Sequence, residues 1–496
     1  MLRKGRPDRA ELVTSGAIWP QRDQSTLFKQ HRLAVKGGIK MANHGLIVGL
    51  DVGTSTIKVL AADVRDQQAN IVAVGRSVAH GVKRGIVVDI DATANDIRQA
   101  IAQVNEQTDV PVTEVVASLP ANNIQIQHVS GMVTVKDSQH ISYADVAAAV
   151  KQAIKIQLPV DREVVELLPT EFIVDDFDGI QDPNDMVGMR LEMKGVAYTA
   201  PRNILANLRM AIAKAGLQLR DFVLAPLAYS KTVLAEGQQE FGTILMDMGA
   251  GQTTATVVHD NQLKFLTTFP AGSENISRDI SAVLEIGLHD ADMLKLDAGL
   301  ALSEMANADN KLVIQKVGAE TPEQVSELMV AQIIEARLMQ ILDKLGEKLN
   351  LVGAFDLPGG VVVTGGGAAL RGAPEAVKAA YQVQVKSFVP SDIGLRHPGY
   401  AGAWAIVHYA AQQTPVQLIV KEALYDLPLT VLGQPTLGRQ VMSTPVQPEP
   451  RQAMQAVQPQ TAEPVDASEY EQTSVENDES PKKQNPIRNF FKEFFD

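Results

Sequence analysis

Two segments that lie far apart in the chain combine a carboxylate, glycine and small polar residues in the same order. Residues 51–58 read Asp-Val-Gly-Thr-Ser-Thr-Ile-Lys, and residues 247–254 read Asp-Met-Gly-Ala-Gly-Gln-Thr-Thr. Glycine and small hydroxyl residues allow backbone amides to close around an anion, and a neighbouring carboxylate can hold a phosphate-bound magnesium ion. One copy alone would say little, because a strand followed by such a turn is common. The recurrence indicates two phosphate-gripping hairpins on two facing lobes.

A third segment places three consecutive glycines, residues 365–367, one threonine after the apolar run 361–363. Glycine lets backbone approach a flat ring closely. In their order and spacing, the three segments resemble the two phosphate motifs and the adenosine motif of the actin, Hsp70 and sugar-kinase superfamily. The resemblance covers about residues 45–411. It implies an ATP-binding cleft between two lobes.

The resemblance also implies roles for individual residues. Asp51 and Asp247 would hold Mg²⁺, mainly through waters, and Lys58 would reach the inner phosphates of ATP. Asp247 and Gln252 would be among the few side chains near the hydrolytic water. The full set of expected cofactor contacts is Asp51, Gly53, Thr54, Ser55, Lys58, Asp247, Gly249, Gly251, Gln252, Thr253, Gly272, Asn275, Lys295, Gly365, Gly366 and Gly367.

The segment 223–230 resembles the hinge helix that joins the two lobes in this superfamily. Filament-forming relatives carry a glutamate there that is thought to position the attacking water, whereas this chain has Ala225. Slow hydrolysis is therefore expected, with ATP acting mainly as a clamp between the lobes. A sugar kinase would need a further carboxylate to take the proton from its acceptor hydroxyl, and none is identifiable.

Within the superfamily, several stretches resemble the FtsA family. Residues 81–89 and 166–172 are similar to the flanks of the subdomain inserted in FtsA, here 124–196, which contacts the next subunit of a filament in that family. Residues 333–337 are similar to the region of FtsA that receives the C-terminal tail of FtsZ. Arg337 is the candidate for pairing with an acidic group on that tail, although a solvated arginine on an amphipathic helix would show the same pattern.

Short β-branched runs alternate with alanine-rich stretches between residues 41 and about 411, which indicates an α/β architecture. With the resemblance, this predicts an actin-like, two-lobed ATPase fold with an FtsA-type inserted subdomain, a disordered linker and a C-terminal amphipathic helix. The expected divisions are a basic extension (1–40), the first part of subdomain 1A (41–123), the inserted subdomain 1C (124–196), a return to 1A with the hinge helix (197–241), subdomain 2A (242–273), subdomain 2B (274–357), the second part of 2A (358–394), a return to 1A with the C-terminal end of the core (395–433), the linker (434–484) and the membrane-binding amphipathic helix (485–496).

Residues 1–40 are basic and irregular, and Met41 directly precedes the first convincing strand, 46–50. Residues 36–40 read Lys-Gly-Gly-Ile-Lys, which is the translation expected of a purine-rich ribosome-binding site upstream of a start codon. We therefore expect translation to begin at Met41. A disordered basic extension that begins at Met1 is the alternative.

The last twelve residues, 485–496, carry an apolar stripe at helical spacing after a linker rich in Gln, Pro, Ser, Thr and Glu. The stripe consists of Ile487, Phe490, Phe491, Phe494 and Phe495. A helix that docks on a protein core would show the same stripe. Its place beyond a linker, with basic residues around it, favours insertion into a membrane surface. One such tail binds reversibly, and a filament that presents many tails binds far more tightly.

The composition excludes several classes of protein. A formal net charge of −13 argues against nucleic acid as a partner. Cysteine is absent, which excludes disulfides and thiolate zinc sites, and the nine histidines lack the paired spacing of a metal site. No apolar run reaches the roughly 18–20 residues of a membrane-spanning helix, so a membrane contact would be peripheral.

The sequence therefore predicts an ATP-binding, actin-like polymer that links FtsZ to the cytoplasmic face of the membrane at the division septum and recruits later division proteins. The expected partners are the C-terminal tail of FtsZ, further copies of the chain through subdomain 1C, and the lipid surface. Two alternatives remain. One is a small-molecule kinase, such as a sugar kinase, of the same superfamily, and the other is a pilus-assembly protein like PilM.

Overall fold

A computed structural model describes residues 45–155 and 158–425. The expected basic extension (1–40), linker (434–484) and amphipathic helix (485–496) lie outside the described residues. In the described ranges, none of the helices combines the length and the apolar content needed to cross a bilayer.

The first lobe is built on a five-stranded sheet in the order β11 (Gln218–Leu224), β6 (Glu114–Leu119), β1 (Gly45–Val52), β2 (Thr56–Arg65) and β3 (Gln68–Val78). Strands β1 to β3 form an antiparallel meander, whereas β6 runs parallel to β1 and β11 parallel to β6. Residues 47–50 of β1 are all buried, as expected for a strand with both faces covered.

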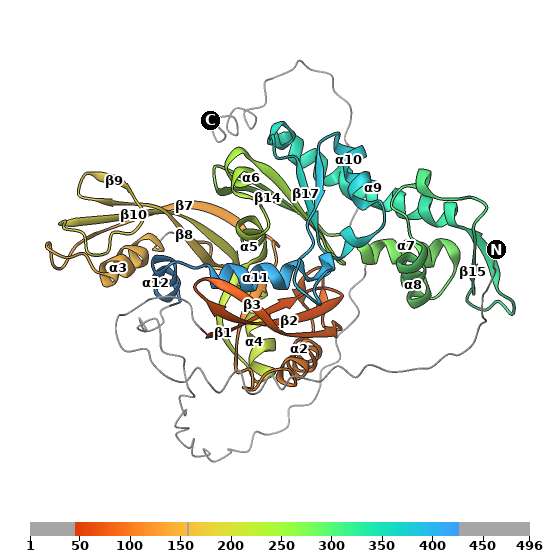
Figure 1. The fold of residues 1–496 in the computed structure, drawn as a ribbon, viewed down its shortest axis with the longest axis horizontal. Coiled ribbons are helices and arrows are strands. Elements are labelled where there is room, and N and C mark those ends of the chain that lie inside the picture. The colour runs from red at the N-terminus through yellow and green to blue at the C-terminus, as the bar shows by residue number, and fades with distance from the viewer. Residues whose placement is uncertain (1–44, 156–157, 426–496) are drawn as a thin grey trace, which may run out of the picture. The chain divides into compact units, whose positions relative to one another are not determined.

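Helices cover both faces of this first sheet. Helix α2 (Ile90–Asn105) contacts β2 and β3 on one face and packs beside α4 (Arg202–Lys214). Helix α11 (Ala401–Ala411) lies on the other face with the hinge helix α5 (Ala225–Thr232) (Figure 1). Two glycines allow these close contacts, because a Cβ at Gly49 would meet Val407 of α11 and a Cβ at Gly75 would meet the carbonyl of Ala100 in α2.

The second lobe repeats the topology of the first. Its sheet has the order β14 (Gln262–Phe269), β13 (Thr253–His259), β12 (Thr243–Met248), β17 (Val361–Thr364) and β18 (Val385–Ser387). Strands β12 to β14 form the antiparallel meander, and β17 and β18 add in parallel. The β12–β13 hairpin is therefore the counterpart of β1–β2, and both hairpins hold a motif recognised in the sequence.

Between β14 and β17, the second lobe carries a smaller unit. It comprises α7 (Ser273–Leu284), α8 (Leu288–Ala298), the hairpin β15 (Lys311–Ile314) and β16 (Glu323–Ser326), and the start of α9 (Glu327–Leu351). These elements share a core of their own, formed by Ile276, Ile280, Leu284, Ile286, Ala291, Ile314, Val325, Val330 and Ile334. Further along α9, Leu338 and Ile341 join the core of the main sheet, so this one helix connects both parts of the lobe.

Short elements complete the two lobes. They are the hairpin β4 (Val82–Lys83) and β5 (Ile86–Val87), the helices α6 (Glu236–Phe241) and α10 (Ala373–Tyr381), and the 3₁₀ turns η1 (Ser303–Met305), η2 (Ala354–Asp356), η3 (Gly366–Ala369) and η4 (Pro398–Tyr400).

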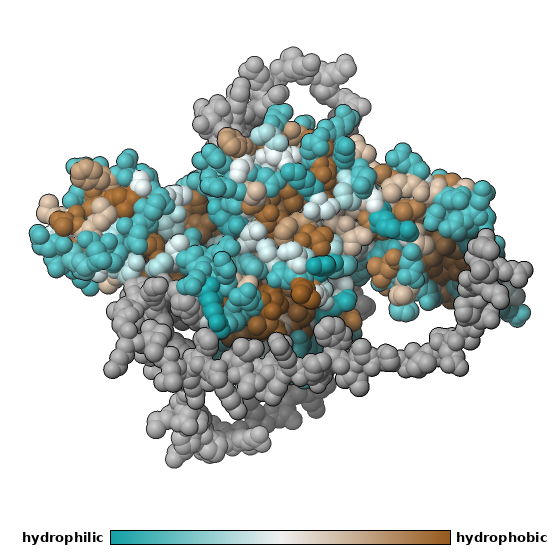
Figure 2. Space-filling view, in the orientation of Figure 1, coloured by the Kyte–Doolittle hydropathy of each residue, from teal (hydrophilic) through white to brown (hydrophobic). Residues whose placement is uncertain are grey.

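A separate four-stranded sheet is inserted in the first lobe between β6 and α4. It has the order β7 (Gln125–Thr134), β10 (Arg190–Pro201), β8 (Arg162–Val174) and β9 (Phe177–Ile180), and α3 (Tyr143–Ala153) packs on one face. The packing is close, because a Cβ at Gly131 would lie 2.2 Å from the carbonyl oxygen of Ala149. Hydrophilic residues cover most of the visible face of this insert, with small apolar areas between them (Figure 2).

The last described helix, α12 (Pro415–Leu424), completes the core of this insert. Its apolar residues Val416, Ile419, Val420 and Ala423 pack with those of α3 and β8. Within 395–433, where we expect the return to subdomain 1A and the C-terminal end of the core, α11 packs on the sheet of the first lobe and α12 on the insert. The insert is therefore built from two stretches of chain that lie far apart in the sequence.

A buried ionic cluster connects α12 to the sheet of the first lobe and to the insert. Lys421 is 6% exposed, and its Nζ lies 3.1 Å from Asp221 Oδ2 on β11 and 3.5 Å from Glu166 Oε2 on β8. Burial alone would lower the pKa of Lys421, but the carboxylates of Asp221 and Glu166 raise it overall. Burial raises the pKa of Glu166 to about 7 although Lys421 opposes the shift. Below about neutral pH Glu166 therefore keeps its proton, and the ammonium of Lys421 lies between a charged Asp221 and a neutral Glu166.

The cluster predicts a pH-dependent stability. Because the pKa of Glu166 in the folded chain is about 7, above its ordinary value of 4.5, the folded state binds this proton more tightly than the unfolded state does. The bound proton therefore stabilises the folded chain fully below pH 4.5, and this stabilisation is lost as pH rises through about 7. The change is on the order of 2–3 kcal/mol, at about 1.4 kcal/mol for each pKa unit. Denaturant unfolding between pH 5 and pH 8 measures it.

The variant Glu166→Gln cannot ionise, so it should lose this part of the pH dependence. Glu163→Gln on the same strand, where the carboxylate is half-exposed and paired with Arg209, is the matched control and should keep it. Equal pH profiles for the wild type and Glu166→Gln would contradict the prediction.

Candidate functional site

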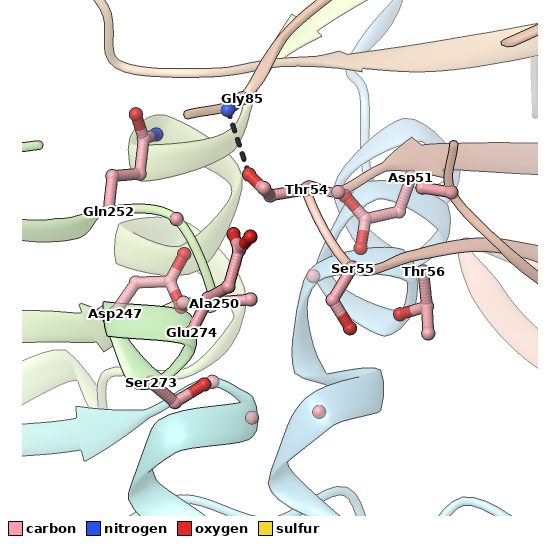
Figure 3. Close-up of a pocket in the computed structure, with 18 of the residues that line it drawn as sticks. Asp51, Thr54, Ser55, Thr56, Gly85, Asp247, Ala250, Gln252, Ser273 and Glu274 are labelled. Carbon is pink, nitrogen blue, oxygen red and sulfur yellow. Dashed lines mark hydrogen bonds between the residues drawn. The ribbon is translucent and has the colours of Figure 1, made fainter. Parts of the chain in front are cut away.

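The two motif hairpins are equivalent residue by residue. In the β1–β2 pair, Asp51 lies opposite Lys58, and in the β12–β13 pair, Asp247 lies opposite Thr254. Each aspartate therefore occupies the same position near the end of the first strand of its lobe. Because the two lobes face each other, the two carboxylates approach one cleft from opposite sides (Figure 3).

The turns of the two hairpins also share their backbone geometry. The amide of Gly53 donates to the carbonyl of Thr56 at 3.2 Å, and the amide of Gly249 donates to that of Gln252 at 2.9 Å. A Cβ at either glycine would lie 2.8 Å from the carbonyl oxygen that closes its turn. Both turns therefore require glycine at this position.

The tips of the hairpins touch across the cleft. A Cβ at Gly251 would lie 2.6 Å from Thr54 Oγ1, so only hydrogen fits between the two turns. On the other side, the amide of Gly85, at the tip of the β4–β5 hairpin, donates to Thr54 Oγ1 at 2.9 Å (Figure 3). Thr54 thus connects three backbone segments around the centre of the cleft.

Two adjoining cavities lie at the cleft, one between the lobes and one within the second lobe. The larger, about 970 Å³, is lined by both hairpins, and the smaller, about 370 Å³, lies between α7, α8, α9 and the glycine-rich turn after β17. They share lining residues, including Gly249, Lys295 and Gly366, so they form one continuous space. The volume of each cavity lies in the range of a small-molecule site.

The structure brings nearly all of the predicted contacts to this space. The larger cavity is lined by Asp51, Gly53, Thr54, Ser55, Lys58, Asp247, Gly249, Gly251, Gln252, Lys295, Gly365 and Gly366. Thr253, Gly272 and Gly367 line the smaller one. Asn275 lines neither; its Oδ1 accepts from the amide of Gly272 at 3.1 Å and caps α7.

The environments of the two aspartates differ. Asp51 Oδ1 accepts a hydrogen bond from Ser118 at 3.0 Å, and Lys58 Nζ lies 3.7 Å from its Oδ2. Burial raises the pKa of Asp247 to about 7, and the charge of Asp51 adds to the shift, whereas Lys58 and a hydrogen bond from Tyr229 oppose it. A cation between the two carboxylates would offset both the burial and the repulsion.

These residues fit a magnesium ion that is bound to phosphate. In the part of the chain that the structure describes, no three acidic or histidine side chains form a cluster that could enclose a metal. Magnesium normally takes one or two carboxylates and completes its shell with water and phosphate oxygens. Asp51 and Asp247 supply that number, and the backbone amides of the two turns lie beside them.

Lys295 is bound more tightly within the protein than its predicted contact with ribose or adenine suggests. Its Nζ donates to Ser277 Oγ at 2.7 Å, to Asp292 Oδ1 at 2.7 Å and to the carbonyl of Ser273 at 3.2 Å. All three ammonium protons thus have partners in α7 and α8. The lysine lines both cavities, chiefly as a brace between these helices.

The glycine-rich turn after β17 approaches the second aspartate. Gly365 has φ +88°, and a Cβ there would lie 2.2 Å from Asp247 Oδ1. A Cβ at Gly366 would meet no atom within 4 Å. The first glycine is therefore required by the carboxylate, and the second leaves open space in the cavity.

The cavity also contains residues that the sequence did not single out, namely Ser118, Tyr229, Glu274, His397 and Gly402. Ser118 had a usable signal. It lies near the carboxyl end of β6, which runs parallel to β1, and ligands gather at such strand ends. Ala225 lines the larger cavity, so the hinge segment offers no side-chain oxygen at that position.

Arg337 lies outside both cavities. Its Nε is 2.5 Å from Asp279 Oδ2 and its Nη2 is 2.8 Å from Asp279 Oδ1, which makes a two-point contact between α9 and α7. The hydrogen bond to Asp279 raises the pKa of Arg337. Its guanidinium is thus already engaged within the chain. The predicted membrane residues Ile487, Phe490, Phe491, Phe494 and Phe495 lie outside the described residues.

Two lobes of identical sheet order, with paired glycine hairpins across one cleft, define an actin-like protein. The chain is similar in fold to the solved PilM–PilN type IV pilus biogenesis complex, with a TM-score of 0.52 and 15% identity over 74% of this chain and 99% of that one. The predicted actin-like fold is confirmed.

The family follows from the sequence comparisons. The family model described as cell division protein FtsA matches residues 244–405, and the model of the SHS2 domain inserted in FtsA matches residues 121–199. The chain is 40% identical to the cell division protein FtsA of Enterococcus faecalis over 92% of this chain and 100% of that protein. It is 38% identical to FtsA of Streptococcus pneumoniae over 88% and 96%, and 34% identical to FtsA of Bacillus subtilis over 76% and 86%, respectively. The chain therefore belongs to the FtsA family of cell-division proteins, as predicted.

The neighbouring glycines 365 and 366 provide a matched test of the site's geometry. Gly365→Ala places a methyl group against Asp247 at a positive φ and should destabilise the chain by about 1–3 kcal/mol. Gly366→Ala, which meets no atom within 4 Å, should leave stability nearly unchanged. Thermal unfolding without nucleotide measures both. Equal stability of the two variants would contradict the proximity of Gly365 to Asp247.

Proposed function

We propose that this chain binds ATP and Mg²⁺ in the cleft between its lobes, polymerises through its insert, and links FtsZ filaments to the cytoplasmic face of the membrane at the division septum. In that position it recruits later division proteins. The observation that carries the nucleotide part of the proposal is the pairing of two equivalent hairpins, each with one carboxylate, across a single cavity.

The two cavities suit the two ends of ATP. The larger one offers glycine turns, Lys58 and the two aspartates, which suit a triphosphate with Mg²⁺. The smaller one is lined by apolar residues such as Ile276, Leu338 and Ile341 together with glycine backbone, which suits a flat base. A bound Mg²⁺ would neutralise phosphate charge and orient the phosphates.

Hydrolysis in this cleft should be slow. Ala225 supplies no group that could position a water, and Asp247 and Gln252 are the proposed catalytic side chains. Gln252 Oε1 is enclosed without a hydrogen-bond partner among the described residues, so it is available to accept from a water near the phosphates. ATP then acts mainly as a clamp that holds the lobes together.

The insert offers surface for self-association. Five large apolar residues of this insert are at least half exposed: Met132 (50%), Val160 (89%), Phe177 (74%), Val187 (64%) and Met189 (68%). Exposed apolar side chains of this size are typical of protein contacts when they gather in one region. The proposed filament contact therefore lies on the insert.

The proposed contact with the FtsZ tail lies near Arg337. Because Asp279 already holds this guanidinium at two points, an acidic group of the tail would share or displace Asp279. Arg337 therefore acts in this proposal as part of a charged pair between α7 and α9 and not as a free cation.

Loss of Lys58 should weaken nucleotide binding. Lys58→Ala removes the cation beside Asp51, and a hydrogen bond to a charged group contributes roughly 1.5–3 kcal/mol, so ATP affinity should fall about 10-fold to 100-fold. Lys214→Ala on the exposed face of α4, where Lys214 pairs with Asp91, is the matched control. Equilibrium dialysis with labelled ATP measures both. A wild-type chain that binds no ATP, or a Lys58→Ala variant that binds it normally, would refute the proposal.

The proposed membrane contact depends on the apolar stripe of the tail. Phe490→Glu together with Phe494→Glu should abolish co-sedimentation with lipid vesicles and leave ATP binding intact, because two charges then face the acyl chains. Gln484→Glu together with Asn489→Glu adds the same charge away from the stripe and should reduce pelleting only slightly. Unchanged pelleting of the first variant would rule out the anchor.

A further inference from the structure

Tyr229 lies at the floor of the cleft on the segment that joins the lobes. It belongs to α5 (Ala225–Thr232), which follows the last strand of the first sheet and precedes the first strand of the second. The residue is 4% exposed, its ring is part of the core of the first lobe, and it lines the larger cavity. A tyrosine fixed in a core and open to a cavity presents its hydroxyl in one orientation.

The hydroxyl of Tyr229 reaches the carboxylate of the opposite lobe. It is a hydrogen-bond partner of Asp247, which lies in β12 of the second lobe. The bond therefore crosses from one lobe to the other beneath the cavity. Of the two partners, the phenol is the donor and the ionised carboxylate the acceptor.

Asp51 of the first lobe reaches the same place. A Cβ at Gly402 of α11 would lie 3.0 Å from Asp51 Oδ2 and 3.1 Å from the hydroxyl oxygen of Tyr229. The hydroxyl of Tyr229 and the carboxylate of Asp51 thus lie beside one glycine of α11. This proximity explains why position 402 carries no side chain.

A neutral donor suits this arrangement. Two carboxylates that face each other in a buried cleft repel, and a second ammonium would compete with the ligand's cation for them. A phenol has only one proton to donate, so it engages one oxygen of Asp247 and leaves the other oxygen free to face an ion. Partners that orient the residues around a metal are typical of metal sites.

We propose that Tyr229 is a positioning residue of the cation site: the hinge helix presents its hydroxyl to Asp247, so that the carboxylates of both lobes are held facing the same ion. The inference rests on the proposed binding of ATP and Mg²⁺. It adds to that proposal a residue of the hinge helix that contacts a proposed magnesium ligand.

The test compares ATP binding with Mg²⁺ and with excess chelator by isothermal titration calorimetry. In the wild type, Mg²⁺ should strengthen binding. In Tyr229→Phe, which keeps the ring and loses the hydroxyl, this Mg²⁺-dependent gain should fall about tenfold, while the affinity for metal-free ATP stays close to that of the wild type. Tyr409→Phe, at another buried tyrosine of the first lobe, is the matched control and should keep the full gain.

A purely structural role of Tyr229 predicts a different result, namely an equal loss of affinity with and without Mg²⁺. That result, or an unchanged gain in Tyr229→Phe, would overturn the inference while ATP binding by the wild type still stands. A wild-type chain that binds no ATP in either condition would overturn the proposed function and this inference with it. If Tyr229→Phe does not fold, Gly402→Ala displaces the hydroxyl and Asp51 by a few tenths of an ångström and should lower the same gain, by a smaller factor.

Discussion

Two carboxylates from different lobes share one buried cleft, and much of the described structure serves to hold them there. Asp51 and Asp247 each sit near the end of a strand whose neighbours fix its position, so neither can withdraw without disturbing a sheet. Their repulsion and burial would favour an open cleft in an isolated chain. The closed arrangement is maintained by contacts at its rim and floor, such as Thr54 against Gly251 and Tyr229 against Asp247. A cation with a phosphate ligand would relieve the strain that these contacts resist.

The duplicated topology explains why so much of the site was visible in the sequence. An aspartate followed by a glycine turn has little meaning once, but its repetition with the same spacing marks two copies of one hairpin. Gly53 and Gly249 could be predicted because the turn itself requires glycine. Position 365 requires glycine for a different reason, because Asp247 lies close to it in space. The two residues are more than a hundred positions apart in the sequence, so this requirement could be expected only from the resemblance.

What the sequence could not show were the pairings between distant side chains. Lys295 and Arg337 were predicted as contacts for a nucleotide and a partner, yet both are held by carboxylates of their own lobe, Asp292 and Asp279. The sequence does not show which carboxylate will pair with a given lysine or arginine in the folded chain. Tyr229 was overlooked for a related reason, since a tyrosine in a hinge helix resembles any other core residue until its hydroxyl is located.

The place of α12 has a consequence for how the chain is made. The hydroxyl of Tyr425, just past the end of this helix, donates to the carbonyl of Val165, 260 positions earlier. The strands of the insert leave the ribosome long before α12, the helix that covers them. Their apolar surface therefore stays exposed while the whole second lobe is synthesised. Contacts of such separation form slowly and leave intermediates prone to aggregation. During synthesis the insert, although it begins early in the chain, is therefore among the last parts to close, and a ribosome that stalls before residue 415 releases a chain whose first lobe carries an open core.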